Sequence, residues 1–309
     1  MKILVAGGTG FLGLHVVNRL KKENLPFITA SLSQGIDFRN YKQTEKFFKE
    51  NKIDTVIYCA AFVGGISYGY EKPAESYYNN ILMATNLIEL SRIYKVKRFI
   101  NPISNCSYPG HLTKKLKEEL WWDGPLHESV LAYGIARKAS WVQTWAYNKQ
   151  YGMDFINLIL PNMYGPSDHF DEKKSHVIGA LIMKMCDAKA EGRKDVIVWG
   201  SGKPIREWLY VKDAVTVILK SISITPTIEP INIGIGEGIS VRALAELIKD
   251  IVGYKGKLVY DPTKPDGAPY KIMDNKRMIK HFMGWIPPTK LRDGIEETVE
   301  WYLNNKKKA

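Results

Sequence analysis

Two hydroxyl residues 29 positions apart, Ser104 and Tyr133, are of the types needed for acid/base chemistry on a carbonyl group. Each lies near the end of a segment predicted to reach the carboxyl edge of a parallel sheet, where open α/β sheets bind ligands. Beside a nicotinamide ring, a serine hydroxyl can hold a carbonyl oxygen while a tyrosine phenol protonates it as hydride arrives. Taken alone, such a pair is more often an exposed hydroxyl and a packed ring, so the interpretation needs a nucleotide site nearby.

A glycine-rich loop at the start of the chain supplies that site. Gly7, Gly10 and Gly13 follow an apolar run, residues 3–6, and precede an amphipathic segment, residues 14–22. Between a strand and a helix, glycines at this spacing allow a tight turn, close approach of the backbone to a pyrophosphate and close helix–strand packing. We therefore predict a dinucleotide site; the alternative is a glycine-rich turn without a ligand. Its predicted contacts are Gly7, Thr9, Gly10, Phe11, Leu12 and Gly13.

Alternating strand-like and helix-like segments would position these residues. Apolar runs predict strands at residues 3–6, 27–30, 55–59, 99–103 and 155–160. Helical patterns such as residues 81–94 and 136–150 lie between them. This alternation predicts an α/β fold with a doubly wound parallel sheet of the Rossmann type. Beyond Pro161, loops rich in Pro, Gly and charge separate shorter elements, which predicts a smaller C-terminal α/β domain that binds the substrate.

Composition limits the partners. The formal charge of +12 on 309 residues comes from lysines scattered over helix faces, with small clusters at 95–98, 114–117 and 306–308. We therefore expect affinity for small anionic substrates and no binding of nucleic acid. The chain has neither a run of ~18 apolar residues nor a signal peptide, so we expect a cytoplasmic protein without membrane contact. Its three cysteines lack metal-ligand spacing, so we expect no metal site.

Eight short segments, in this order, resemble the extended short-chain dehydrogenase/reductase family, and within it the GDP-L-fucose synthases most closely. They are residues 7–13, 60–66, 104–109, 161–166, 175–178, 199–202, 206–208 and 264–267. In that family, one pocket epimerises a nucleotide-linked keto sugar at carbons 3 and 5 and reduces it at carbon 4 with NADPH. The resemblance implies a dinucleotide-binding domain over residues 1–160 with part of 207–235, and a nucleotide-sugar-binding domain over residues 161–206 and 236–309.

The resemblance also implies roles for individual residues. It makes Cys106 and His176 the acid/base pair of epimerisation, which suits a thiol and an imidazole because both can be tuned to ionise near neutral pH; by residue type alone, each would more often be structural. It makes Arg137 the cation beside Tyr133. Further cofactor contacts are implied at Ser31, Asp37, Phe38, Ala60, Ala61, Tyr133 and Arg137. Substrate contacts are implied at Asn162, Val177, Lys184, Trp199, Arg206 and Lys271.

Three departures from the family pattern bear on these roles. Arg137 stands where the family has lysine, four residues after Tyr133 and so on the same helix face. Neither an acid nor a base follows the second predicted strand, where Ser31 and Ser33 stand; we predict NADP as the cofactor, with NAD as the alternative. A tryptophan pair, residues 121–122, replaces the usual substrate loop, either as a wall of the sugar pocket or, more often for such pairs, as packing.

We therefore predict an NAD(P)H-dependent enzyme that epimerises a GDP-linked 4-keto-6-deoxy sugar at carbons 3 and 5 and reduces it at carbon 4. One alternative is a related enzyme that only epimerises, or only reduces or oxidises. The other is a non-catalytic regulator that senses the cofactor. The family also implies a homodimer formed through the helices predicted at residues 81–94 and 136–150.

Overall fold

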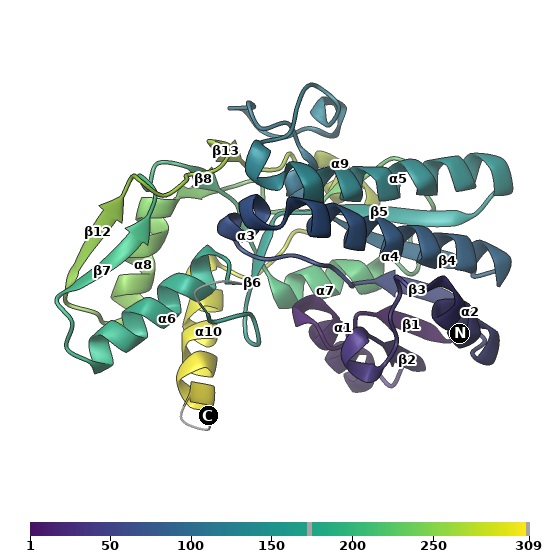
Figure 1. The fold of residues 1–309 in the computed structure, drawn as a ribbon, viewed down its shortest axis with the longest axis horizontal. Coiled ribbons are helices and arrows are strands. Elements are labelled where there is room, and N and C mark those ends of the chain that lie inside the picture. Colours follow the sequence, from purple (N-terminus) through teal and green to yellow (C-terminus); the bar gives the residue numbers. More distant parts are fainter. Residues whose placement is uncertain (172–174, 307–309) are drawn as a thin grey trace.

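The computed structural model describes residues 1–171 and 175–306, and Figure 1 shows a central sheet flanked by helices beside a smaller mixed part. Residues 172–174 and 307–309 lie outside the described residues. The latter include Lys307 and Lys308 of the predicted terminal lysine cluster and the last residue of the predicted second domain.

Six parallel strands form the central sheet. In spatial order they are β10 (Ile231–Asn232), β5 (Asp154–Leu160), β4 (Arg98–Ser104), β3 (Thr55–Tyr58), β1 (Ile3–Ala6) and β2 (Phe27–Ala30). Every neighbouring pair runs parallel. Five of the six are the predicted apolar runs, and their bounds differ from the prediction by at most one residue at each end. The predicted α/β fold with a doubly wound, Rossmann-type parallel sheet is therefore confirmed.

Five helices cover this sheet: α1 (Phe11–Lys22), α2 (Tyr41–Glu50), α4 (Pro73–Ile93), α5 (Leu131–Tyr151) and α7 (Val211–Lys220). They cover both faces because the strands are apolar on both sides. Along β1, Ile3 and Val5 pack in one core with α1 and α7, whereas Leu4 and Ala6 pack in another with α2 and α4. In Figure 1, α5 runs beside α4, and α1 and α7 lie on the other side of the sheet.

A second hydrophobic core holds the smaller part together. Its main elements are α6 (Val177–Ala190), β7 (Asp195–Trp199), α8 (Val241–Val252), β12 (Lys257–Asp261) and α10 (Leu291–Lys306). Strands β7 and β12 pair in parallel, and side chains such as Ile182, Leu244 and Val299 are buried between the sheet and the helices. Between these segments the chain returns to the first core through α7 and β10. The predicted domain boundaries stay a prediction.

Short elements complete the fold. The short helices are α3 (Ile66–Glu71), α9 (Lys276–His281), η1 (Leu32–Gln34), η2 (Asn105–Ser107), η3 (Glu118–Leu120) and η4 (Glu128–Val130). The short strands are β6 (Asn162–Tyr164), β8 (Ile205–Arg206), β9 (Trp208–Tyr210), β11 (Ile239–Ser240) and β13 (Tyr270–Lys271). Strand β6 pairs with β9, and β8 lies between β11 and β13.

Two helices begin earlier than predicted, and one of them positions a site residue. Helix α4 starts at Pro73 rather than near residue 81, because proline suits the first helical position, where its missing N–H would have no partner. Helix α5 starts at Leu131 rather than near residue 136, directly after the short turn η4. Tyr133 therefore lies in the first turn of α5 and not in the preceding loop.

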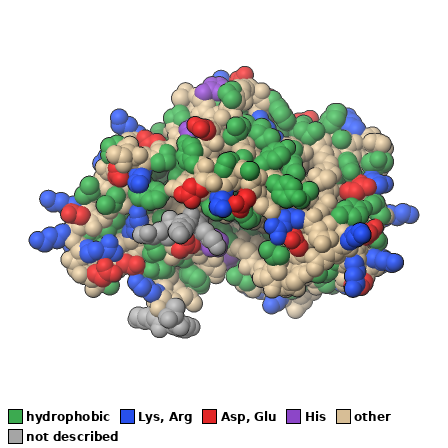
Figure 2. Space-filling model, in the orientation of Figure 1, with side chains coloured by type: hydrophobic (Ala, Val, Ile, Leu, Met, Phe, Trp, Pro, Cys, Tyr) green, Lys and Arg blue, Asp and Glu red, His purple; other side chains and the backbone are tan. Residues whose placement is uncertain are grey.

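The surface carries dispersed charge and one apolar region. On the face in Figure 2, Lys and Arg side chains lie apart with Asp and Glu among them, and hydrophobic side chains gather over α4 and α5. In the two stretches of chain that the structure describes, no helix combines the length and the apolar character needed to cross a bilayer.

Candidate active site

One cavity of about 890 Å³ opens at the carboxyl ends of β1, β3, β4 and β5 and extends to α6, β7 and the segment before β13. This is where open α/β sheets bind their ligands. Apart from Gly13, every residue that sequence reasoning assigned to the site lines this cavity. The structure thus brings the predicted catalytic, cofactor and substrate residues together, while the role of each stays a prediction.

The glycine loop between β1 and α1 has no room for side chains at two of its glycines. Gly7 has a φ of +87°, and a Cβ there would lie 2.6 Å from the backbone of Ala60. A Cβ on Gly13 would lie 2.1 Å from the Gly7 carbonyl oxygen, so Gly13 serves helix–strand packing outside the cavity. Gly10 caps α1 without a side chain, which leaves the first N–H groups of the helix open to an anion. The loop therefore fits a dinucleotide pyrophosphate.

Three hydroxyl groups meet at the end of β2, where the adenosine ribose of a dinucleotide lies in this fold. Thr9 Oγ1 is 3.0 Å from Ser31 Oγ and 2.8 Å from Ser33 Oγ, and the two serine oxygens are 3.1 Å apart. Arg39 also lines the cavity but forms an ion pair with Asp37 at 2.7 Å. The hydrogen bond from Arg39 lowers the pKa of Asp37. The hydroxyl cluster therefore offers hydrogen-bond donors that suit a 2′-phosphate.

An acidic residue in this hydroxyl cluster is expected to weaken NADPH selectively. Ser33→Asp places a carboxylate beside the 2′-phosphate, and the repulsion should raise the Kd for NADPH about tenfold or more. The Kd for NADH, which lacks that phosphate, should change less than twofold. Fluorescence titration of both cofactors measures this, with Ser223→Asp, an exposed serine outside the cavity, as the charge-matched control. An equal loss for both cofactors would contradict the placement of the 2′-phosphate.

Phe38 and Asp37, predicted to lie at the adenine edge, both line the cavity. Phe38 is also part of the core beneath α2 and α4 and is 3% exposed. Only a small part of the Phe38 side chain is therefore accessible to a ligand.

Ser104 and Tyr133 reach the cavity from neighbouring elements. Ser104 ends β4, and its Oγ accepts a hydrogen bond from the Cys106 N–H at 3.1 Å. Arg137 lies one helical turn after Tyr133, with its guanidinium carbon 5.3 Å from the centre of the Tyr133 ring. The contact predicted from the helical spacing is therefore confirmed, and it sets a fixed positive charge beside the phenol.

Cys106 lies beside two cations. It is partly buried in η2, directly after β4. Lys271 is buried and donates from Nζ to the Asn105 carbonyl oxygen at 3.2 Å; burial lowers the pKa of Lys271, and Cys106 acts in the opposite direction. Burial also lowers the pKa of Arg206 to about 10, again opposed by Cys106. The family resemblance implied both cations as substrate contacts, and the structure places them near Cys106 as well.

His176 directly precedes α6 and lines the same cavity. Burial lowers the pKa of His176, and the charge of His169 adds to this effect. The imidazole is therefore neutral near pH 7, so that it can accept a proton at one ring nitrogen and donate one from the other.

The smaller part of the fold lines one end of the cavity with α6, β7 and the loop after β12. Lys184 Nζ and Lys264 Nζ lie 5.1 Å and 5.3 Å from the centre of the Trp199 ring. Trp199 is 39% exposed and lines the cavity. An accessible aromatic ring flanked by ammonium groups suits a ligand that combines a flat base with phosphates.

Sequence reasoning missed several titratable residues that line the cavity, among them Tyr58, Asp168 and His169. Burial raises the pKa of Asp168 to about 7, and the His169 N–H donates to its Oδ1 at 2.8 Å. Tyr58 carried a usable signal, because a phenol at the carboxyl end of an otherwise apolar strand reaches the ligand edge of the sheet. The positions of Asp168 and His169 in their loop match no motif that would mark them as site residues.

Trp121 and Trp122 do not line the cavity. Trp121 is 1% exposed and packs against Trp141, with ring centres 5.4 Å apart. Lys138 donates from Nζ to the Trp121 carbonyl oxygen and lies 4.3 Å from the centre of the Trp122 ring. The interpretation of this pair as a wall of the sugar pocket is therefore wrong, and the packing alternative holds.

Across residues 1–171 and 175–306, no three side chains of His, Cys, Asp or Glu are arranged to hold a metal ion.

Comparisons with known proteins place the chain in a family. Residues 3–234 match the model of the NAD dependent epimerase/dehydratase family. A GDP-L-fucose synthase of Sinorhizobium fredii is 38% identical over 307 residues, which is 98% of this chain and 96% of that protein. A GDP-6-OMe-4-keto-L-xylo-heptose reductase from C. jejuni has a TM-score of 0.92 at 29% identity, covering 98% of both chains. A GDP-L-fucose synthetase from Naegleria fowleri bound to NADP has a TM-score of 0.90 at 30% identity, covering 100% of this chain and 94% of that one.

These relatives share the central sheet and the smaller part over nearly their whole length, and the motifs of the family stand around the cavity of this chain. The chain therefore belongs to the NAD dependent epimerase/dehydratase family, of the extended short-chain dehydrogenase/reductase type that its motifs predicted.

Proposed function

We propose that this chain is an NADP-dependent enzyme that epimerises a GDP-linked 4-keto-6-deoxy sugar at carbons 3 and 5 and reduces it at carbon 4. One observation carries the proposal: a single cavity holds the hydroxyl pair Ser104 and Tyr133 and the thiol–imidazole pair Cys106 and His176 beside a loop that fits a dinucleotide. The related GDP-L-fucose synthases and the NADP-bound relative support a nucleotide-sugar epimerase/reductase that uses NADP.

The reduction needs a proton for the ketone oxygen. When bound, NADPH supplies the hydride that adds to carbon 4. In the proposed mechanism, the Ser104 hydroxyl holds the oxygen on carbon 4 by a hydrogen bond, and Tyr133 gives it a proton, so that the ketone becomes a secondary alcohol. The guanidinium of Arg137 offsets the negative charge that this transfer leaves on the phenol oxygen.

The epimerisation needs a base on one face of the sugar and an acid on the other. Hydrogens beside the carbon 4 ketone are acidic, so one member of the Cys106 and His176 pair removes a proton and the other returns one to the opposite face. The neutral state of His176 suits it to either step. Lys271 and Arg206 offset the negative charge on sulfur whenever Cys106 gives up its proton.

A second candidate is a reductase that does not epimerise. It is favoured by the similarity to the heptose reductase from C. jejuni, whose name states reduction of a GDP-linked 4-keto heptose. In that case, Ser104 and Tyr133 keep their proposed roles, whereas Cys106 and His176 only line the pocket.

A reaction in heavy water with GDP-4-keto-6-deoxymannose and NADPH separates these functions. Deuterium at carbons 3 and 5 together with a reduced carbon 4, read by mass spectrometry and NMR of the product, is the expected result. Reduction without deuterium would favour the second candidate. Tight NADPH binding without any change in a panel of GDP-linked 4-keto sugars, heptoses included, would overturn both and return the chain to the cofactor-sensing alternative.

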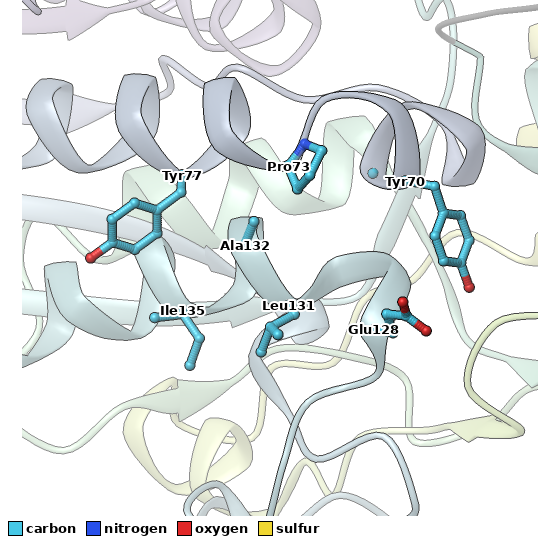
Figure 3. Close-up of a pocket in the computed structure, with 8 residues that line it drawn as sticks. Tyr70, Pro73, Tyr77, Glu128, Leu131, Ala132 and Ile135 are labelled. Atoms are coloured by element: carbon cyan, nitrogen blue, oxygen red, sulfur yellow. The ribbon is translucent and has the colours of Figure 1, made fainter.

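The homodimer is also part of this proposal. Apolar side chains stand exposed along one face of α5, at Leu131, Ile135, Val142 and Trp145. Figure 3 shows Leu131, Ala132 and Ile135 of α5 facing Tyr77 and Pro73 of α4 across a shallow pocket of about 480 Å³. Contiguous exposed apolar surface of this kind is typical of an interface, and a second copy of α4 and α5 would cover it by a symmetric contact.

Val142→Arg is expected to separate the homodimer into protomers. A cation in the middle of an apolar two-fold interface meets its own copy, so the cost is doubled, and association should weaken about 100-fold. Light scattering measures the mass in solution. Leu303→Arg on α10, a similarly exposed apolar residue, is the control that should leave the mass unchanged. A wild type that is monomeric at micromolar concentration would contradict the interface.

A further inference from the structure

Arg137 is a buried cation with few compensating contacts. Its side chain is 4% exposed, and no carboxylate in the described part of the chain lies within ion-pair distance. One guanidinium nitrogen donates to the Ala60 carbonyl oxygen at 3.0 Å, and Nε is buried without a hydrogen-bond partner among the described residues. Because burying a charge is costly unless other groups offset it, something besides this one hydrogen bond must hold the guanidinium.

The ring of Tyr58 is the group in position to do so. The guanidinium carbon of Arg137 lies 5.0 Å from the centre of the Tyr58 ring and 5.3 Å from the centre of the Tyr133 ring. Both distances are within the range of a cation–π contact. Tyr58 ends β3 and is 1% exposed, so its ring has a fixed place. Burial raises the pKa of Tyr58, and the charge of Arg137 opposes part of that rise, so the two groups interact electrostatically.

We propose that Tyr58 is a positioning residue, whose ring holds the guanidinium of Arg137 beside the phenol of Tyr133. The inference rests on the proposed function, because it assigns Tyr58 to the reduction through Arg137. Tyr58 at the end of β3 and Ala60 in the loop that follows it contact the guanidinium, and α5 carries Arg137 and Tyr133 on one face. The ring makes the contact on which the proposal rests. The Tyr58 hydroxyl also acts on Arg137 electrostatically, but it makes no hydrogen bond of normal geometry with any described residue.

Removal of the ring is therefore expected to lower kcat for reduction about tenfold, with the KM for the sugar and the Kd for NADPH changed less than twofold. Tyr58→Leu removes the ring, and Tyr58→Phe keeps it and should stay within threefold of the wild type. The assay follows NADPH oxidation with GDP-4-keto-6-deoxymannose, and rates are normalised to NADPH-binding sites. Tyr58→Met, of closer volume, serves if the leucine variant does not fold.

A double-mutant cycle with R137K tests whether Tyr58 acts through Arg137. A compact, strongly hydrated ammonium does not stack on a ring as a guanidinium does, so in the R137K background Tyr58→Leu should cost less than threefold. Phe99→Leu removes another buried ring of the same core, 6.1 Å from Tyr58 between ring centres, and should leave the kcat of both backgrounds unchanged. An equal loss from Tyr58→Leu in both backgrounds, or no loss in either, overturns the proposal.

The same cycle, measured by denaturant unfolding of the cofactor-free protein, separates this inference from the proposed function. The factor by which the double variant changes the unfolding equilibrium constant should differ at least threefold from the product of the factors for Tyr58→Leu and R137K. A double-variant factor equal to that product overturns the contact. If the wild type oxidises no NADPH, the proposed function has failed, and this unfolding cycle still decides whether the ring holds the guanidinium.

Discussion

Tyr133→Phe should lower the rate of NADPH-dependent reduction about a thousandfold, the largest loss expected from any single substitution in this chain. The substitution removes only the phenol oxygen, and a positioned general acid contributes about 10²–10⁴ to the rate. Because Tyr133 lies in the first turn of α5 with the Arg137 guanidinium 5.3 Å from its ring centre, the ring should keep its place. NADPH oxidation with GDP-4-keto-6-deoxymannose measures the rate.

The matched control for this variant is Tyr164→Phe. Tyr164 is also a buried tyrosine, 2% exposed, but it belongs to the second core and does not line the cavity. Tyr164→Phe should keep the rate of reduction within twofold of the wild-type rate, and both variants should bind NADPH as the wild type does. A Tyr133→Phe variant that keeps a tenth or more of the rate would show that another group protonates the oxygen on carbon 4.

Cys106→Ser should reduce deuterium exchange at carbons 3 and 5 about a hundredfold or more, while cofactor binding stays unchanged. A serine hydroxyl keeps the shape of the side chain but ionises far less readily than a thiol, so it is a poor proton carrier near pH 7. Incubation of the keto sugar with enzyme and NADP⁺ in heavy water isolates the exchange from the reduction, and NMR reads the deuterium at each carbon.

Cys186→Ser controls for the loss of a thiol as such, because Cys186 is buried in α6 and does not line the cavity. His176→Gln should match the effect of Cys106→Ser if the two residues form one acid/base pair. If each variant fails to incorporate deuterium at only one of the two carbons, the two residues act on separate positions. Undiminished exchange in Cys106→Ser would remove Cys106 from the epimerisation.

The elements that follow from local pattern could be predicted from the sequence. Five of the six strands of the central sheet are short apolar runs with turn signals at their ends, and the glycine loop directly follows the first of them. The contact between Tyr133 and Arg137 follows from the rise of a helix. The start of α5 was placed too late because Leu131 continues from the turn η4 without a capping side chain, so no residue type marks the boundary.

Contacts between distant segments could not be predicted in the same way. Tyr58 on β3 contacts Arg137 on α5, and Lys271 on β13 reaches the backbone beside Cys106. In each case, the separation of the two residues along the chain matches no helical or strand repeat. The tryptophan pair at 121–122 shows that residue type alone cannot separate a packing role from a binding role. Aromatic side chains serve packing and ligand binding equally well, and only the position of Trp121 under Trp141 and Lys138 decides for packing.

The pairing of β10 with β5 has a consequence for how the chain is made. Ile231 pairs with Leu158 and Asn232 with Ile159, so the strand that completes the sheet is synthesised only after residues 161–230. Throughout that interval, a nascent chain presents β5 as an apolar edge with unpaired N–H and C=O groups, which is a template for association with other chains. Aggregation of incomplete chains is therefore expected to begin at β5.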